Sequence, residues 1–146
     1  MPEKETLEQA AEDKREGKAP STQAGEFVKE EIEHVREGKH GARSTKQAIA
    51  IGLAKARRAG VKLPAKKGAS KKTKKQAARD TRKGKSASKG KKSAKRSRAT
   101  LNALKREGHS AASKKALSRQ ARSAAAKRSA ASRSRAAKKA AATRKK

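Results

Sequence analysis

Large apolar side chains are scarce in this chain of 146 residues. It contains one Phe and no Tyr or Trp, and only thirteen of its residues are Val, Ile, Leu or Phe. A share of roughly one tenth, combined with high net charge, is typical of disordered sequences, because globular domains usually hold at least about twice that share. Most of the nominal 32% hydrophobic content is alanine, which buries little area. The sequence therefore excludes a single compact globule spanning the whole chain.

Three other absences exclude further classes of protein. Without cysteine, the chain has no disulfide framework, no thiolate zinc site and no cysteine nucleophile. No run of about 18 apolar residues is present, so we expect no membrane span and no membrane partner. The first residues, Met-Pro-Glu-Lys-Glu, lack the apolar core of a signal peptide. We therefore expect a cytoplasmic protein, or a nuclear one if its source is eukaryotic.

Charges of the two signs are distributed very unevenly. The chain has 44 Lys and Arg against 13 Asp and Glu, a net charge of +31. Residues 1–40 hold 11 of the acids, and beyond them only Asp80 and Glu107 are acidic. Ten of the thirteen large apolar residues lie within residues 1–63. We therefore predict a small head over residues 1–63 and a long basic tail, an asymmetry that is typical of nucleic-acid-binding arms.

Helix start and stop signals predict an all-α head. Capping boxes begin at Thr6 and Ser44, each with Gln three residues later. Glycine follows each candidate helix, and Gly60 with Val61 fits a left-handed helix end. We expect helices over residues 6–16, 22–37 and 45–59. A three-helix head or hairpin of this size has a core that is marginal alone, so we expect homodimerisation or ligand binding to complete the fold.

The second of these helices is amphipathic. At 100° per residue, an apolar stripe and an acidic stripe fall on opposite faces. The apolar stripe contains Ala24, Val28, Ile32 and Val35, with Phe27 at its edge. We expect solvent exposure for the acids Glu30, Glu33 and Glu37. In the third helix, Gly52 allows a neighbouring helix to approach closely.

After Pro64 the composition changes to Lys, Arg, Ala, Ser and Gly. We predict a disordered basic linker over residues 64–98, because Gly and Ser interrupt any period and the lysines repel one another. Residues 99–146 are rich in the helix formers Ala, Lys and Arg, and a short helix is expected over residues 100–107. Crowded positive charge opposes helices here in water, so we expect phosphate to favour them.

Catalytic and metal-binding motifs are not evident. His34, His40 and His109 lie far apart in the sequence, without paired metal-ligand spacing. No Gly-rich loop precedes a helix in the manner of a nucleotide-binding motif. We expect His34 to pack at the apolar edge of its helix and His40 to lie in a loop, where a phosphate contact is plausible. The chain is therefore predicted to be no enzyme and to hold no metal or cofactor.

Phosphate binding is the chemistry that this composition favours, since a dense run of Lys and Arg releases counterions from nucleic acid. Base-specific reading is not expected, because Arg57 and Arg58 end their helix, whereas the N-terminal part of a recognition helix usually meets the bases. Without Tyr or Trp, stacking on single strands is nearly absent. The candidate nucleic-acid-binding residues are Arg43, Lys46, Lys55, Arg57, Arg58, Lys66, Lys67, Lys71, Lys72, Lys74, Lys75, Lys91, Lys92, Lys95, Arg96, Arg98, Lys114, Lys115, Arg119, Arg122, Lys127, Arg128, Arg133, Arg135, Lys138, Lys139 and Arg144.

Two parts of the chain resemble known families. The tail sequence Lys-Lys-Ser-Ala-Lys-Arg-Ser-Arg-Ala over residues 91–99, followed by Ala, Lys and Arg, resembles bacterial histone H1-like nucleoid proteins. The sequence Gln-Ala-Ile-Ala-Ile over residues 47–51 is similar to the core of a family of small bacterial proteins of unknown function. The first resemblance implies binding to DNA in the nucleoid, and the second implies no particular activity or binding residue.

These features predict a non-enzymatic, nucleoid-associated protein that binds DNA largely without sequence preference. The tail would neutralise duplex phosphate, and the head would dimerise or dock a partner and so compact the DNA. Two alternatives remain open. The first is an RNA- or ribosome-associated basic protein, and the second is a partner-recruiting adaptor that is tethered to DNA.

Overall fold

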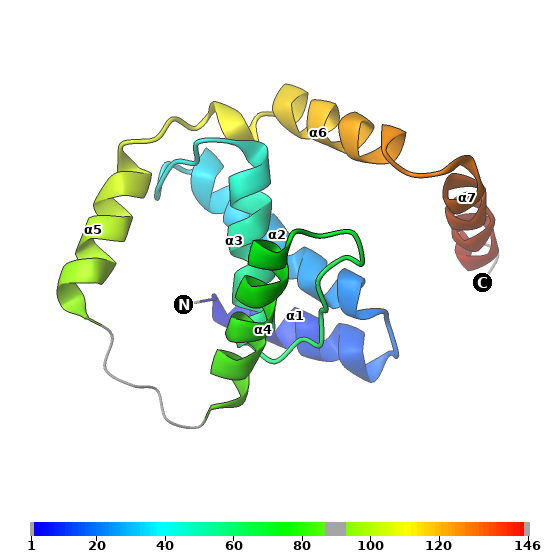
Figure 1. Cartoon of the computed structure of the whole chain (residues 1–146), viewed down its shortest axis with the longest axis horizontal. Helices are drawn as coiled ribbons and strands as arrows, with labels where there is room; N and C mark the ends of the chain where they lie inside the picture. Colours follow the sequence, from blue (N-terminus) through cyan, green and yellow to red (C-terminus); the bar gives the residue numbers. More distant parts are fainter. Residues whose placement is uncertain (1, 87–92, 145–146) are drawn as a thin grey trace.

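The computed structural model describes residues 2–86 and 93–144, and the regular secondary structure of these residues is all helical (Figure 1). The predicted all-α class is confirmed. None of the described helices is long and apolar enough to cross a membrane. In chain order the elements are α1 (Lys4–Arg15), α2 (Pro20–Arg36), α3 (Thr45–Arg58), α4 (Lys71–Lys85), α5 (Ala94–Lys105), the 3₁₀ turn η1 (Ser110–Ala112), α6 (Lys114–Ala126) and α7 (Ala130–Arg144).

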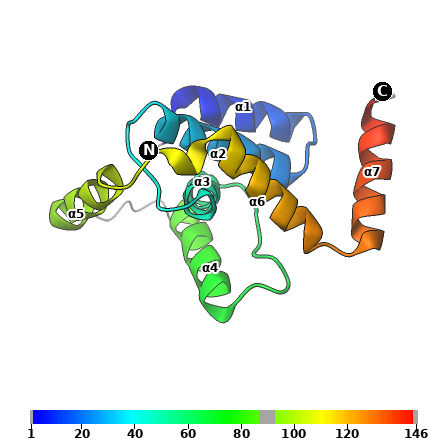
Figure 2. The same cartoon turned by 90° about the horizontal axis from the view of Figure 1, so that it is seen from above.

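Helices α1 to α4 pack in the order in which they occur in the chain. Helix α1 lies on α2, α2 lies on α3, and α3 lies on α4 (Figure 2). The first three helices confirm the three predicted for the head, with ends that differ by at most two residues. The packed unit continues beyond residue 63, because α4 is part of the stack.

The predictions for the ends of these helices agree with the structure more closely than those for their starts. Gly60 has a φ of 99°, and the next N–H, that of Val61, donates to the Ala56 carbonyl at 3.1 Å. This is the predicted left-handed end, which a residue with a Cβ adopts only at a cost. The predicted capping box at Thr6 is wrong. Helix α1 begins earlier, at Lys4, and no side chain caps its first turn.

Alanine dominates the interior. Two clusters of buried side chains hold the helices together, and each contains only two residues larger than alanine. The first cluster joins α1, α2 and α3 through Ala10, Ala24, Phe27, Ala56 and Val61. The second cluster contains Ile32, Val35, Ala42, Ala48, Ala111 and Ala112. Its last two residues come from η1, so a part of the basic tail belongs to the core.

The segment from Leu104 to Ala112 is held against the α2–α3 loop by its own backbone. The Gly41 N–H donates to the Leu104 carbonyl at 2.9 Å, and the Ala42 N–H donates to the Gly108 carbonyl at 3.1 Å. A Cβ at position 41 would collide with the Glu107 carbonyl, so only glycine permits this approach. We call residues 104–112 the docked segment, because it leads into α6 and places the start of that helix against α3.

The predicted disordered linker over residues 64–98 is wrong wherever the structure describes it as helical. Lys71–Lys85 forms α4, and α5 begins at Ala94; residues 87–92 lie outside the described residues. Helix α4 forms because its face against α3 buries Ala77 and Asp80, and because the Ser70 side chain accepts a hydrogen bond from the Thr73 N–H at 3.2 Å.

Serine starts helices in this chain. The sequence interpretation recognised this role at Ser44 but treated the serines of residues 64–98 as interruptions. The Ser44, Ser70, Ser93 and Ser113 hydroxyls each accept a hydrogen bond from the backbone N–H three residues later. Such capping contributes about 1 kcal/mol per helix. The short helix expected over 100–107 overlaps a longer one, α5, that begins behind Ser93, and α6 and α7 follow it.

The close contact between α2 and α3 should depend on Gly52. A Cβ at this position would lie 2.7 Å from the Val28 Cα and 2.9 Å from the Phe27 carbonyl oxygen. We expect Gly52→Ala to destabilise the fold by about 1–2 kcal/mol, since overpacking outweighs the gain in helix propensity. Urea unfolding followed by far-UV circular dichroism measures this change.

Gly25→Ala is the matched control, because Gly25 lies within α2 and a Cβ there meets nothing within 4 Å. This variant should gain up to about 1 kcal/mol from helix propensity alone. Equal changes in the two variants would contradict the close contact at Gly52.

Candidate nucleic-acid interface

Most of the predicted phosphate-binding bases are exposed on the helices that follow the head. Lys66 and Lys67 lie in the loop before α4, and Lys91 and Lys92 fall outside the described residues. The exposed bases on helices or between them are Lys71, Lys72, Lys74 and Lys75 on α4, Lys95, Arg96 and Arg98 on α5, Lys114, Lys115, Arg119 and Arg122 on α6, Lys127 and Arg128 before α7, and Arg133, Arg135, Lys138, Lys139 and Arg144 on α7.

Helix α4 carries a larger basic surface than the sequence interpretation included. Four further bases, which were not among the candidates, are exposed on it: Arg79, Arg82, Lys83 and Lys85. No feature of the sequence separates them from the candidates Lys71, Lys72, Lys74 and Lys75 of the same segment. In the sequence, the start of this helix is indicated by Ser70, a residue type that caps helices, followed by Lys71, Lys72 and Thr73.

A single buried acid attaches this basic helix to the head. The Asp80 carboxylate is almost fully buried and accepts hydrogen bonds from Arg58 Nε at 2.9 Å and Arg58 Nη2 at 2.7 Å. The Gln76 side chain donates to the same carboxylate at 3.3 Å. Arg58 was predicted to bind phosphate, but in this structure its guanidinium is committed to Asp80.

Lys55 is the other predicted base that pairs within the head. Its ammonium lies 2.9 Å from Glu30 Oε1 and 2.7 Å from Glu31 Oε2. Burial alone would lower the pKa of Lys55, but the two carboxylates outweigh burial and raise it. We leave Lys55 and Arg58 out of the interface. One nitrogen of the Arg57 guanidinium, Nε, donates a hydrogen bond to the Leu63 carbonyl at 2.8 Å. Lys46 is exposed on α3.

The structure brings Arg43 together with two bases of α6 that are distant from it in the sequence. An open pocket of about 300 Å³ lies between the first turns of α3 and α6, and Arg43, Lys115 and Arg119 are in its lining. The hydroxyls of Ser44, Ser110 and Ser113 line it as well. We call it the basic pocket. Sequence reasoning found its three bases separately but not their convergence, which depends on the docked segment.

The backbone around the basic pocket also favours anions. Two helices start there, behind Ser44 and Ser113, and the first N–H groups of a helix lack partners within it. The Thr45 hydroxyl donates to the Ala111 carbonyl at 2.6 Å, which holds the two helix starts together. Positive helix ends and cationic side chains act in the same direction on a phosphate group.

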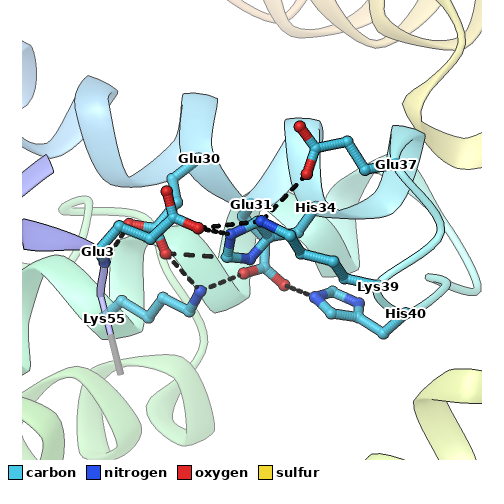
Figure 3. A network of polar contacts seen from close by, with 8 residues as sticks. All are labelled: Glu3, Glu30, Glu31, His34, Glu37, Lys39, His40 and Lys55. Carbon is cyan, nitrogen blue, oxygen red and sulfur yellow. Dashed lines mark hydrogen bonds and ion pairs between the residues drawn. The ribbon is translucent and has the colours of Figure 1, made fainter. Parts of the chain in front are cut away.

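The head also contains a network of acids and bases, drawn in Figure 3. Glu30 was expected to face solvent, but it is buried, as is Glu31. Glu30 can be buried because Lys55 of α3 and the backbone N–H of Glu3 donate hydrogen bonds to its carboxylate. Burial raises the pKa of Glu30, and these contacts outweigh it, so the pKa is lowered.

Two histidines belong to this network rather than to an apolar edge or a phosphate site. His34 Nε2 lies 2.8 Å from Glu3 Oε1, and His40 Nε2 lies 3.2 Å from Glu31 Oε1. The expected packing role of His34 is therefore corrected to a polar one. Hydrogen bonds from His34 and Lys39 lower the pKa of Glu3 to about 2, and these contacts anchor the start of α1 on α2.

Residues 5–67 match a sequence-family model. The family is DUF6496, a family of unknown function. The match spans α1 to the loop before α4 and is consistent with the expected resemblance of the head to small proteins without an assigned activity. It includes Glu30, Glu31, His34, His40 and Lys55, and only the α3 side of the basic pocket. No curated protein and no solved structure matches the chain.

The attachment of α4 should depend on the charge of Asp80. We expect Asp80→Asn to lower the free energy of unfolding by about 1–2 kcal/mol, because the hydrogen bonds to Arg58 lose their charged acceptor. Amides of residues 77–82 should then exchange faster with deuterium, as hydrogen-exchange mass spectrometry measures.

Glu107→Gln is the control, since it removes the same charge and the Glu107 carboxylate forms no ion pair among the described residues. Unchanged exchange in α4 of the Asp80 variant would show that the ion pair does not hold this helix.

Proposed function

We propose that this protein is a non-enzymatic, nucleoid-associated DNA-binding protein that neutralises and compacts duplex DNA with little sequence preference, in the manner of histone H1-like proteins. The observation that carries the proposal is the pairing of charges. In the described part of the chain, every ion pair is made by a base at or before Arg58. The bases of α4 to α7 are exposed and unpaired with acids, so they are available to phosphate.

Several acids of the head already have cationic partners within the head. Glu3, Glu30, Glu31 and Glu37 already pair with lysines or histidines of the head. These contacts reduce the negative charge that the four carboxylates present to the tail helices. The alternative of an adaptor, whose acidic head recruits a partner, has no comparable observation in its favour.

The arrangement of the basic helices suits compaction. Helix α4 extends from one side of α3, whereas α5 and the α6–α7 pair extend in other directions (Figure 2). None of α5, α6 and α7 contains a buried residue. Bases therefore project on several sides of the head, and one chain can contact more than one stretch of duplex. A homodimer through the head would multiply this effect.

The affinity for duplex DNA should fall steeply with salt. If about ten bases contact phosphate, the slope of log affinity against log salt should be about −9. Fluorescence anisotropy on two duplexes of unrelated sequence measures both the slope and the lack of preference. Affinity that does not change with salt would refute the proposal. Tighter binding to an equally long structured RNA would transfer the function to the RNA alternative.

The basic pocket should contribute a defined part of this affinity. Replacing Arg43, Lys115 and Arg119 by Gln should reduce the steepness of the salt slope by about 3, since each lost phosphate contact removes about one unit. The control replaces Lys4, Lys14 and Lys29 of the head by Gln, which removes the same charge from exposed positions. Equal slopes for the two triple variants would mean that only net charge matters and that the pocket does not.

A further inference from the structure

Three potential metal ligands converge inside the head. Glu31, His34 and His40 each offer a ligand atom, and these atoms all lie within 4.8 Å of one another. The Glu31 side chain is 1% exposed, and the two imidazoles are 12–13% exposed. The cluster is thus enclosed, unlike the exposed acidic groups that are common on protein surfaces. Figure 3 shows Glu31 and His40 directed toward each other, with the His34 ring beside them and its nitrogens toward Glu3 and Glu30.

The local fold explains the convergence. His34 lies three positions after Glu31 on α2, so the two residues lie on the same side of the helix. Gly38 has a φ of 76° after the helix ends, and the reversed chain brings His40 back beside them. The two imidazole rings then lie 6.1 Å apart, nearly perpendicular to each other. The sequence spacing Glu-x₂-His-x₅-His does not show this proximity.

We propose that Glu31, His34 and His40 form a binding site for a divalent transition-metal ion, with zinc as the best fit. Two imidazole nitrogens and one carboxylate oxygen are a ligand set that Zn²⁺ uses in proteins, with a fourth position left for water or another carboxylate. At Zn–ligand distances of about 2.0–2.2 Å, tetrahedral ligand atoms lie ~3.3 Å apart. Atoms within 4.8 Å reach that spacing by small side-chain rotations.

The outer contacts of both histidines support this assignment. Metal-bound histidines almost always donate their other ring N–H to a carbonyl or carboxylate, which fixes the tautomer. His40 Nδ1 lies 3.0 Å from the Gly41 carbonyl oxygen, which can only accept, so Nε2 is left facing Glu31. His34 Nε2 lies 2.8 Å from the Glu3 carboxylate, so Nδ1 is left facing the Glu30 side, 4.0 Å from Glu30 Oε1.

Lys55 does not exclude the ion. Its ammonium lies 2.7 Å from Glu31 Oε2, an atom without a hydrogen bond of ordinary geometry. The other oxygen, Oε1, faces His40 Nε2. The Glu31 carboxylate can therefore contact Lys55 through Oε2 and bind the metal through Oε1. The Lys55 ammonium then lies beside the metal and does not occupy its position.

The charge of the network leaves room for a divalent cation. Four carboxylates, those of Glu3, Glu30, Glu31 and Glu37, meet the two ammonium groups of Lys39 and Lys55. With neutral imidazoles, the formal balance is −2, which one divalent ion cancels. The competing occupant is a proton on each imidazole, which cancels the same charge. Metal ligation requires the neutral imidazole, so the two occupants can be distinguished by experiment.

The test uses the full-length chain, freed of metal by dialysis against a chelator. Isothermal titration with Zn²⁺ at neutral pH should give one ion per chain, and Co²⁺ should develop the visible bands of a tetrahedral site. The variants His34→Ala and His40→Ala should bind Zn²⁺ at least about a hundredfold more weakly, because loss of an outer-sphere partner alone costs 10–100-fold. Added Zn²⁺ should raise the melting temperature of the unaltered chain but not that of these two variants.

His109→Ala is the matched control, because His109 is exposed and lies outside the cluster. It should bind Zn²⁺ as the unaltered chain does. His40→Gln, with its fold checked by circular dichroism, separates lost ligation from lost structure. Absence of stoichiometric Zn²⁺ binding by the unaltered chain would overturn the proposal, as would equal weakening in the His109 variant. The DNA-binding proposal is independent of either result.

Discussion

The shortage of large apolar side chains is the constraint on which the architecture depends. Burial of alanine removes little apolar surface, and at roughly 25 cal/mol per Å² it contributes correspondingly little stability. The helices compensate by approaching closely. Gly52 brings α3 against the backbone of α2, and Ala24, Ala48 and Ala56 fill the space between them without any exposure. Phe27 is the one large ring in this interior, and it is fully buried.

Ion pairs to buried carboxylates contribute to the contacts between helices, in addition to apolar packing. The head buries Glu30 and Glu31, and α4 buries Asp80; buried carboxylates are costly unless they are paired. Lys55 pairs with the first two, and Arg58 pairs with the third. These two bases are thereby withdrawn from the nucleic-acid interface, while the cations on the tail helices keep no acidic partner. The same chain therefore contains a charge-compensated head and an uncompensated polycation.

Sequence reasoning predicted the parts of the fold that local chemistry determines. The helices of the head, the glycine at Gly60 and the close approach at Gly52 each follow from a short stretch of residues. It failed where distant segments meet. Glu30 was placed in solvent because its partner Lys55 lies on another helix, and α4 was missed because its stability depends on Asp80 meeting Arg58. The convergence of Glu31, His34 and His40 was hidden for the same reason, since it depends on the turn after α2.

The α2–α3 loop connects these features physically. His40 belongs to the buried network, Gly41 and Ala42 bind the backbone of the docked segment, and Arg43 lines the basic pocket. A shift of this loop would therefore alter the network, the docking of the tail and the pocket together, because these three features depend on four consecutive residues of one loop. The docked segment leads through η1 into α6, so the position of the loop determines where the cations of α6 lie relative to those of α3. The order of the buried network and the geometry of the phosphate-binding surface are thus properties of one short segment.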